Sequence, residues 1–169
     1  KGFGLYRLLF DGGKIDCQEM YAKILVDNGI AFTPKLLDEL YRYDSASWAH
    51  PNPEALVWMV DLKTRGYKIG ILTNMSDQFA TDYFPQAFAG QIALADAVVV
   101  SARVKLVKPD RPIYDLMATR IGLAPAELLF IDDMPRNVEA ARRYGWNGIV
   151  LTTVAQARAE ADALLAAAR

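Results

Sequence analysis

The stretch LLFIDDMPRNVEAARRYGW, residues 128–146, places a short apolar run directly before two adjacent acids and a helical pattern. Leu128 to Ile131 has the length and apolar character of a buried strand. Arg136 to Tyr144 has the spacing of an amphipathic helix. Asp132 and Asp133 therefore fall at the carboxyl end of a predicted strand, and in an open α/β sheet this is the edge at which ligands bind.

Other apolar runs of strand length alternate with helical patterns along the chain. The runs are Tyr67 to Leu72, Asp96 to Val100 and Gly148 to Leu151. The helical patterns cover roughly Asp77 to Phe84 and Pro112 to Ile121, and a final Ala-rich helix starts at Val154. Nearly all-apolar strands that alternate with helices predict an α/β fold, with a parallel sheet covered on both faces.

The N-terminal third of the chain is predicted to be helical. One helix runs from Asp16, which can cap its start, to Asn28, where Asn-Gly supplies a left-handed stop. A second helix opens at Thr33-Pro34 and is predicted to end at about Arg42, before a loop from Asp44 to Pro51. A third helix starts at Asn52-Pro53-Glu54, where a cap precedes a proline in the first turn.

Polar side chains follow the predicted strands at the point where each strand ends. Thr73 and Asn74 follow the run from Tyr67 to Leu72. Ser101 follows the run from Asp96 to Val100, with Lys108 a little further on. The acidic pair follows the run from Leu128 to Ile131. Adjacent acids at the end of a buried strand repel each other, and an oxygen-preferring cation such as magnesium resolves that repulsion. Lys108 beside such a metal indicates that a doubly charged phosphoryl group lies between them. On this view Lys108 meets its partner only when substrate is bound, so we expect it to add little to the stability of the free protein.

Composition excludes several classes of partner. The 169 residues contain 19 basic and 20 acidic side chains, so there is no basic field to attract nucleic acid or an anionic membrane. Cys17 is the single cysteine, which excludes an intramolecular disulfide and fits a cytoplasmic location. No apolar run approaches the roughly 20 residues needed to cross a bilayer. We therefore expect a small-molecule substrate; the sequence leaves the oligomeric state open.

Three segments resemble motifs of the haloacid dehalogenase-like (HAD) hydrolase superfamily. GYKIGILTN (66–74), KPDRPIY (108–114) and the stretch at 128–146 are similar to its second, third and fourth motifs, and the likeness covers Pro53 to Leu151. The resemblance implies a Rossmann-like three-layer core over residues 53–169, with a small helical cap over residues 1–52. It also implies an Mg²⁺-dependent phosphatase of a small phosphomonoester, nearest to the sugar-phosphate and flavin-nucleotide phosphatases.

The resemblance further implies roles for individual residues. Thr73 and Asn74 bind the transferred group, Lys108 is the lysine of the third motif, and Asp132 and Asp133 bind the metal. Asn137, one helical turn further on, resembles an asparagine that follows the paired acids, and it is a candidate substrate-binding residue. An ordinary role as a polar residue in the first turn of a helix is the alternative for Asn137.

The first motif of the family, an aspartate nucleophile usually followed two positions later by a second Asp, has no clear match. Asp11 is the only candidate, and position 13 is Gly. Either Asp11 is a surface turn residue next to a cap helix, or LYRLLF (5–10) is the central strand and Asp11 is the nucleophile. Only 62 residues (73 − 11) separate Asp11 from Thr73, which is short for a strand plus a cap, so we favour the first interpretation. The catalytic strand is then expected upstream of Lys1.

The sequence leaves two alternatives to a magnesium-dependent phosphatase. One is a haloacid dehalogenase, whose mechanism needs no metal and against which the acidic pair argues. The other is a non-catalytic phosphate-binding module, which the absence of an upstream Asp would favour.

Overall fold

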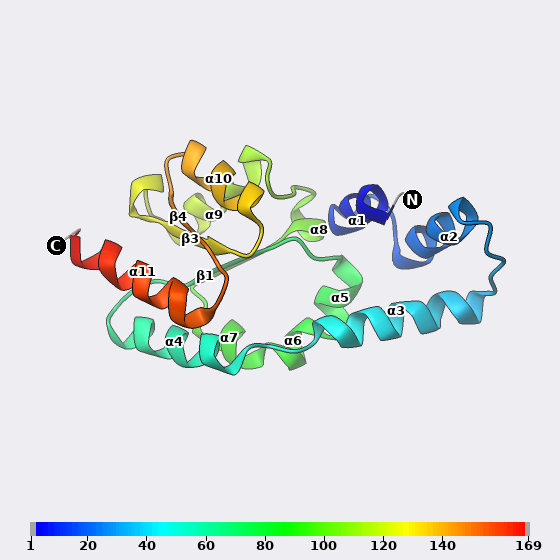
Figure 1. Cartoon of the computed structure of the whole chain (residues 1–169), viewed down its shortest axis with the longest axis horizontal. Helices are drawn as coiled ribbons and strands as arrows, with labels where there is room; N and C mark the ends of the chain where they lie inside the picture. Colours follow the sequence, from blue (N-terminus) through cyan, green and yellow to red (C-terminus); the bar gives the residue numbers. More distant parts are fainter. Residues whose placement is uncertain (1–2, 168–169) are drawn as a thin grey trace. The chain divides into compact units, whose positions relative to one another are not determined.

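The computed structural model of the chain describes residues 3–167 (Figure 1). The chain divides into two compact units. The first comprises Lys1–Pro51, Ile71–Ala93 and Val98–Val107, and the second comprises Asn52–Gly70, Leu94–Ala97 and Lys108–Arg169. The division into a cap and a core that the sequence analysis predicts stays a prediction.

The first unit is mainly helical. Its helices are α1 (Phe3–Asp11), α2 (Cys17–Asp27), α3 (Pro34–Trp48), α5 (Asp77–Asp82), α6 (Phe84–Ala87) and α8 (Ser101–Val104). Helix α7 (Ala89–Leu94) continues into the second unit by one residue. Strands β1 (Gly70–Thr73) and β2 (Ala97–Val100) pair in a two-stranded sheet, and the first residue of each strand belongs to the second unit.

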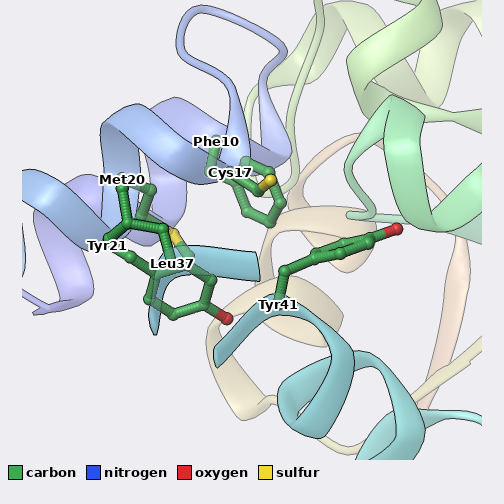
Figure 2. Close-up of a cluster of buried hydrophobic side chains, with 6 residues drawn as sticks. All are labelled: Phe10, Cys17, Met20, Tyr21, Leu37 and Tyr41. Carbon is green, nitrogen blue, oxygen red and sulfur yellow. The ribbon is translucent and has the colours of Figure 1, made fainter. Parts of the chain in front are cut away.

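The predicted caps of α2 and α3 are present. Asp16 accepts a hydrogen bond from the Glu19 amide at 2.7 Å, and Thr33 accepts one from the Leu36 amide at 3.3 Å. Helices α1, α2 and α3 then pack on a shared apolar core (Figure 2). Its buried members are Phe10, Cys17, Met20, Tyr21, Leu37 and Tyr41. Burial raises the pKa of the Cys17 thiol to about 11, so Cys17 is a neutral core residue at physiological pH.

Helix α3 is longer than the sequence analysis predicted. It continues to Trp48, so the predicted loop from Asp44 is wrong over its first five residues. The segment contains neither Gly nor Pro to stop the helix, and Ser45 is buried on its inner face. The Trp48 indole also donates to the Asp44 carboxylate one turn earlier, at 3.1 Å, which favours the helical conformation.

The LYRLLF segment is helical, which contradicts its interpretation as the central strand. It lies within α1, and Asp11 is the last residue of that helix. Asp11 is not a surface turn residue either, because only 7% of it is exposed and its carboxylate pairs with Arg7 at 3.1 Å. The apolar residues of a short run can belong to a helix face as easily as to a strand, and here the contacts with α2 decide between them.

The second unit combines helices with a parallel strand pair. Its helices are α4 (Pro53–Thr64), α9 (Arg111–Ile121), the 3₁₀ turn η1 (Pro125–Glu127), α10 (Pro135–Arg143) and α11 (Val154–Ala167). Strand β3 (Leu129–Asp132) pairs in parallel with β4 (Asn147–Val150), and α10 contacts both strands (Figure 1). This parallel unit agrees with the predicted α/β class. Among the described residues, however, the four strands form two separate two-stranded sheets, β1-β2 and β3-β4.

Candidate active site at the end of β3

The end of β3 presents the predicted acidic pair in two different environments. Phe130 and Asp132 are buried, because alternate residues of a strand face the same side. Asp132 is the last residue of β3 and lies opposite Val150 of β4. Asp133 follows the strand and is exposed to solvent. The two neighbouring carboxylates therefore differ sharply in solvation.

Lys108 forms a buried ion pair with Asp132. Its Nζ atom lies 2.6 Å from Oδ2 of Asp132, and the two residues are 7% and 8% exposed. The ammonium also lies 5.4 Å from the centre of the Phe130 ring, within the range of a cation-π interaction. A buried charge pair of this kind needs further hydrogen bonds to offset the loss of hydration.

The second oxygen of Asp132 receives those hydrogen bonds from the first turn of α10 and from Met134, the residue that precedes this helix. Oδ1 accepts from the Met134 amide and from Nδ2 of Asn137, both at 2.9 Å. Asn137 is itself 5% exposed, and within residues 3–167 no hydrogen-bond partner reaches its Oδ1 atom. A buried amide oxygen without a donor is costly in a free protein and indicates a place for a ligand or water.

Tyr114 supports Asn137 from the side of α9. Its hydroxyl donates to the Asn137 carbonyl at 2.9 Å, and its ring is fully buried. Edge-to-face contacts join this ring to three other aromatic rings: Phe130, Tyr144 and Trp146. Burial, and then the nearby charge of Asp132, raise the pKa of the Tyr114 hydroxyl. The hydroxyl therefore stays protonated and acts as a donor across the physiological pH range.

Thr73 and Asn74 belong to the other compact unit. Thr73 is the last residue of β1, Asn74 follows it, and both are partly buried. The segment after them is fixed by Ser101, whose hydroxyl accepts from the Met75 amide at 2.8 Å and donates to the Asp11 carbonyl. The structure thus brings Lys108, Asp132 and Asn137 together, and the approach of Thr73 and Asn74 to them stays a prediction.

Comparison with known proteins identifies the family. Residues 9–145 match the family described as haloacid dehalogenase-like hydrolase, which is most of the chain. The chain belongs to this family. The resemblance seen in the sequence motifs is confirmed.

Individual relatives show what this HAD chain is similar to. Phosphatase MT3486 of Mycobacterium tuberculosis is 32% identical over 124 residues, which cover 73% of the chain and 57% of the phosphatase. (S)-2-haloacid dehalogenase 4A of Burkholderia cepacia is 26% identical over 97 residues, which cover 57% of the chain and 41% of that enzyme. The chain thus spans about half the length of each of these relatives.

A solved structure establishes the fold independently. A mutant HAD family enzyme of Bacteroides thetaiotaomicron, crystallised with magnesium and inorganic phosphate, superposes with a TM-score of 0.65 at 21% identity. The match covers 85% of this chain and 71% of that protein. The predicted Rossmann-like α/β fold with a helical cap is confirmed at the level of fold class.

The side chains at the end of β3 are compatible with magnesium. Magnesium prefers oxygen ligands and often binds through one or two carboxylates, with water and substrate phosphate completing its shell. The exposed carboxylate of Asp133 and the unpartnered Oδ1 of Asn137 are oxygen donors of this type. The described residues contain no cluster of three or more His, Cys, Asp or Glu side chains suited to a metal. Within this HAD chain the acids alone therefore supply only part of a coordination shell.

Tyr114 is the residue of this site that the sequence analysis missed. It lies in the segment KPDRPIY, six positions after Lys108, on the same helix as the buried Ile113 and Met117. A tyrosine on an apolar helix face is itself a signal, because a buried hydroxyl needs a hydrogen-bond partner. The sequence could have shown that need, although not that the partner is the Asn137 carbonyl.

Across residues 3–167, no helix combines the length and the apolar character required to traverse a bilayer.

Proposed function

We propose that the protein is a magnesium-dependent phosphatase of a small phosphate monoester, acting through an aspartyl-phosphate intermediate. One observation carries the proposal: the buried Lys108-Asp132 pair lies next to the exposed Asp133 at the carboxyl end of β3. A fixed cation beside carboxylates suits a doubly negative group that is held between the cation and a metal.

Each residue of the proposed site has a task in binding or charge neutralisation. The Thr73 hydroxyl and the Asn74 amide bind phosphoryl oxygens, and the Lys108 ammonium offsets the charge that develops on the transferred group. Asp132 and Asp133 form the acidic side of the magnesium site, and Asn137 offers its amide next to them. Magnesium, when bound, supplies further charge neutralisation at the phosphoryl oxygens.

The proposed reaction needs an aspartate nucleophile, and Asp11 does not suit that role. Asp11 is a poor nucleophile because it ends a helix, is buried and is paired with Arg7. We therefore assign the nucleophile to none of the described residues.

The similarity to a phosphatase and to a protein crystallised with magnesium and phosphate supports this proposal. The test is hydrolysis of 4-nitrophenyl phosphate by the full-length protein, with magnesium and with EDTA. Turnover with magnesium that EDTA abolishes would support the proposal. Equal rates with and without metal, or no hydrolysis at all, would contradict it.

A 2-haloacid dehalogenase is the second candidate, and the similarity to the Burkholderia cepacia enzyme favours it. The acidic pair distinguishes the two, because a metal-free dehalogenase has no use for an exposed carboxylate beside Asp132. Chloride release from 2-chloropropionate in EDTA would favour the dehalogenase.

A further inference from the structure

The backbone of Met75, in the turn after β1, is held at both its amide and its carbonyl by the start of α8. The Met75 amide donates to the Ser101 hydroxyl oxygen at 2.8 Å, and the Met75 carbonyl accepts from the Ala102 amide at 3.3 Å. These residues all belong to the first compact unit. The turn that follows β1 is thus fixed by residues that directly follow β2, the strand with which β1 pairs.

We propose that Ser101 is a positioning residue for the phosphoryl-binding turn Thr73-Asn74 and acts through the peptide that joins Asn74 to Met75. The inference rests on the proposed function, which assigns the phosphoryl oxygens to Thr73 and Asn74. Ser101 does not touch the reacting group in this scheme. Its hydroxyl fixes the backbone directly after Asn74, and with it the direction in which this turn meets the phosphate.

The hydroxyl of Ser101 is oriented as an acceptor toward the turn. A serine hydroxyl has one proton, and here that proton is donated to the Asp11 carbonyl at the end of α1. The other acceptor near the hydroxyl, the Met75 carbonyl, lies farther away, at 3.2 Å. The Asp11 carbonyl therefore leaves an oxygen lone pair of Ser101 for the Met75 amide.

The end of α1 is itself fastened to α8, which it contacts (Figure 1). The Lys105 ammonium donates to the Gly13 carbonyl at 2.8 Å. Gly13 has a φ of 65°, and its backbone comes so close to α8 that a Cβ there would lie 2.7 Å from the Ala102 carbonyl oxygen. These contacts hold the Asp11 carbonyl beside Ser101, so the hydroxyl keeps one orientation before any substrate binds.

The burial of Ser101 makes its hydroxyl hard to replace. The residue is 0% exposed, so water cannot take over the hydrogen bond to the Met75 amide without a movement of the chain. Loss of the hydroxyl should therefore displace the turn and weaken phosphate binding in the ground state and the transition state alike. Such a uniform loss raises KM and leaves kcat nearly unchanged. A change that only destabilises the fold lowers the fraction of active enzyme, which lowers the apparent kcat and leaves KM unchanged.

The test compares Ser101→Ala with Ser76→Ala in the full-length protein. Ser76 is the matched control, because it is 3% exposed and its hydroxyl also accepts one backbone amide, that of Phe79 at 3.2 Å. That amide belongs to α5, so the control removes a buried hydroxyl and a helix cap without touching the bond to the turn. The measurements are kcat and KM for 4-nitrophenyl phosphate with magnesium, and the inhibition constant of inorganic phosphate.

We expect Ser101→Ala to raise both KM and the inhibition constant of phosphate by about fivefold to tenfold, the factor that corresponds to one lost hydrogen bond. The kcat of Ser101→Ala should fall by less than about threefold, and Ser76→Ala should keep KM and the inhibition constant within about twofold of the wild type. Wild-type values for Ser101→Ala, or equal changes in both variants, would overturn the inference and leave the proposed phosphatase intact. A wild-type protein that hydrolyses no phosphate ester would overturn the proposed function and this inference with it.

Ser101→Cys covers the case in which Ser101→Ala folds poorly. The thiol fills the space of the hydroxyl but is only a weak hydrogen-bond acceptor. The inhibition constant of phosphate for this variant should lie at least about twofold above that of the wild type, because the bond to the Met75 amide is weakened. A wild-type constant in Ser101→Cys would overturn the positioning role.

Discussion

The Nζ atom of Lys108 lies 2.6 Å from Oδ2 of Asp132 in the free protein, with both side chains buried. From the sequence alone we expect this lysine to contribute little to the stability of the free protein, because its partner there is the substrate. The structure corrects that expectation, because the lysine already has a buried carboxylate partner. Removing one member of a buried pair leaves the other charge without compensation, which typically costs about 3–5 kcal/mol.

Lys108→Met is therefore predicted to affect both turnover and stability. Turnover should fall by about two to three orders of magnitude, because a preorganised charge partner of the reacting group is lost. The free energy of unfolding should fall by about 3–5 kcal/mol, because Asp132 stays buried without its cation. The measurements are kcat on an aryl phosphate and denaturation in EDTA, both with the full-length protein.

Lys35→Met is the matched control, since the Lys35 side chain is 85% exposed and its contact with Glu39 is long, at 3.8 Å. It should change neither quantity. Near-normal turnover of Lys108→Met would contradict the assignment of Lys108 as the lysine of the third motif. It would also contradict the role of Lys108 in the proposed phosphatase.

Asp11 provides a second prediction, about the location of the nucleophile. Residues 1–169 alone should show no magnesium-dependent turnover, and Asp11→Asn in the full-length protein should leave turnover unchanged. The variant should lose about 1 kcal/mol of stability, because the Arg7-Asp11 pair is only partly shielded from water. Aryl phosphate hydrolysis and urea denaturation test these points. Activity of residues 1–169 that Asp11→Asn abolishes would instead make Asp11 the nucleophile.

Local signals in the sequence predicted most of the elements correctly. The caps at Asp16 and Thr33 and the acidic pair at the carboxyl end of β3 depend on neighbouring residues, and these predictions agree with the structure. The helical state of LYRLLF depends on its contacts with α2, which periodicity does not report. The extension of α3 to Trp48 depends on the lack of a stop residue and on the hydrogen bond from Trp48 to Asp44, and hydrophobic periodicity does not report these either.

For the candidate site, too, the sequence predicted which residues lie near one another but not which side chains pair. Strand-end positions predicted that Lys108 and Asp132 would lie close together, and they do. The sequence could not show that they pair with each other, because a motif gives residue types and order but not the side-chain contacts of the free protein. The same reason explains why Tyr114, which contacts the Asn137 backbone from another helix, was not recognised.

Asp96 gives a prediction about acid stability. Its pKa is lowered by the hydrogen bond from Lys63 and by the Ile69 amide. A lowered folded pKa contributes stability above the unfolded pKa of about 3.9, and that stability is lost as pH falls through the folded pKa. The melting temperature of Asp96→Asn should therefore be below that of the wild type at pH 5, and the difference should shrink towards pH 3. A difference that is constant over this range would mean that the Asp96 charge is not the cause. Asp115→Asn, on an exposed helix position, is the control.

Tyr114→Phe tests the support of Asn137 by α9. The variant keeps the ring and its aromatic contacts and removes only the hydroxyl that donates to the Asn137 carbonyl at 2.9 Å. The loss of one buried hydrogen bond should lower the free energy of unfolding by about 1 kcal/mol, measured in urea with an unchanged m-value.

Turnover of Tyr114→Phe should fall by less than about tenfold, since about 1 kcal/mol of lost positioning corresponds to roughly a fivefold change in rate. Tyr43→Phe is the matched control, because Tyr43 is 76% exposed and should tolerate the same chemical change without effect. If the two variants behave alike in both measurements, the Tyr114 hydroxyl does not hold α10, and the position of Asn137 beside Asp132 must depend on the Met134 turn and the packing of α10 on β3 and β4.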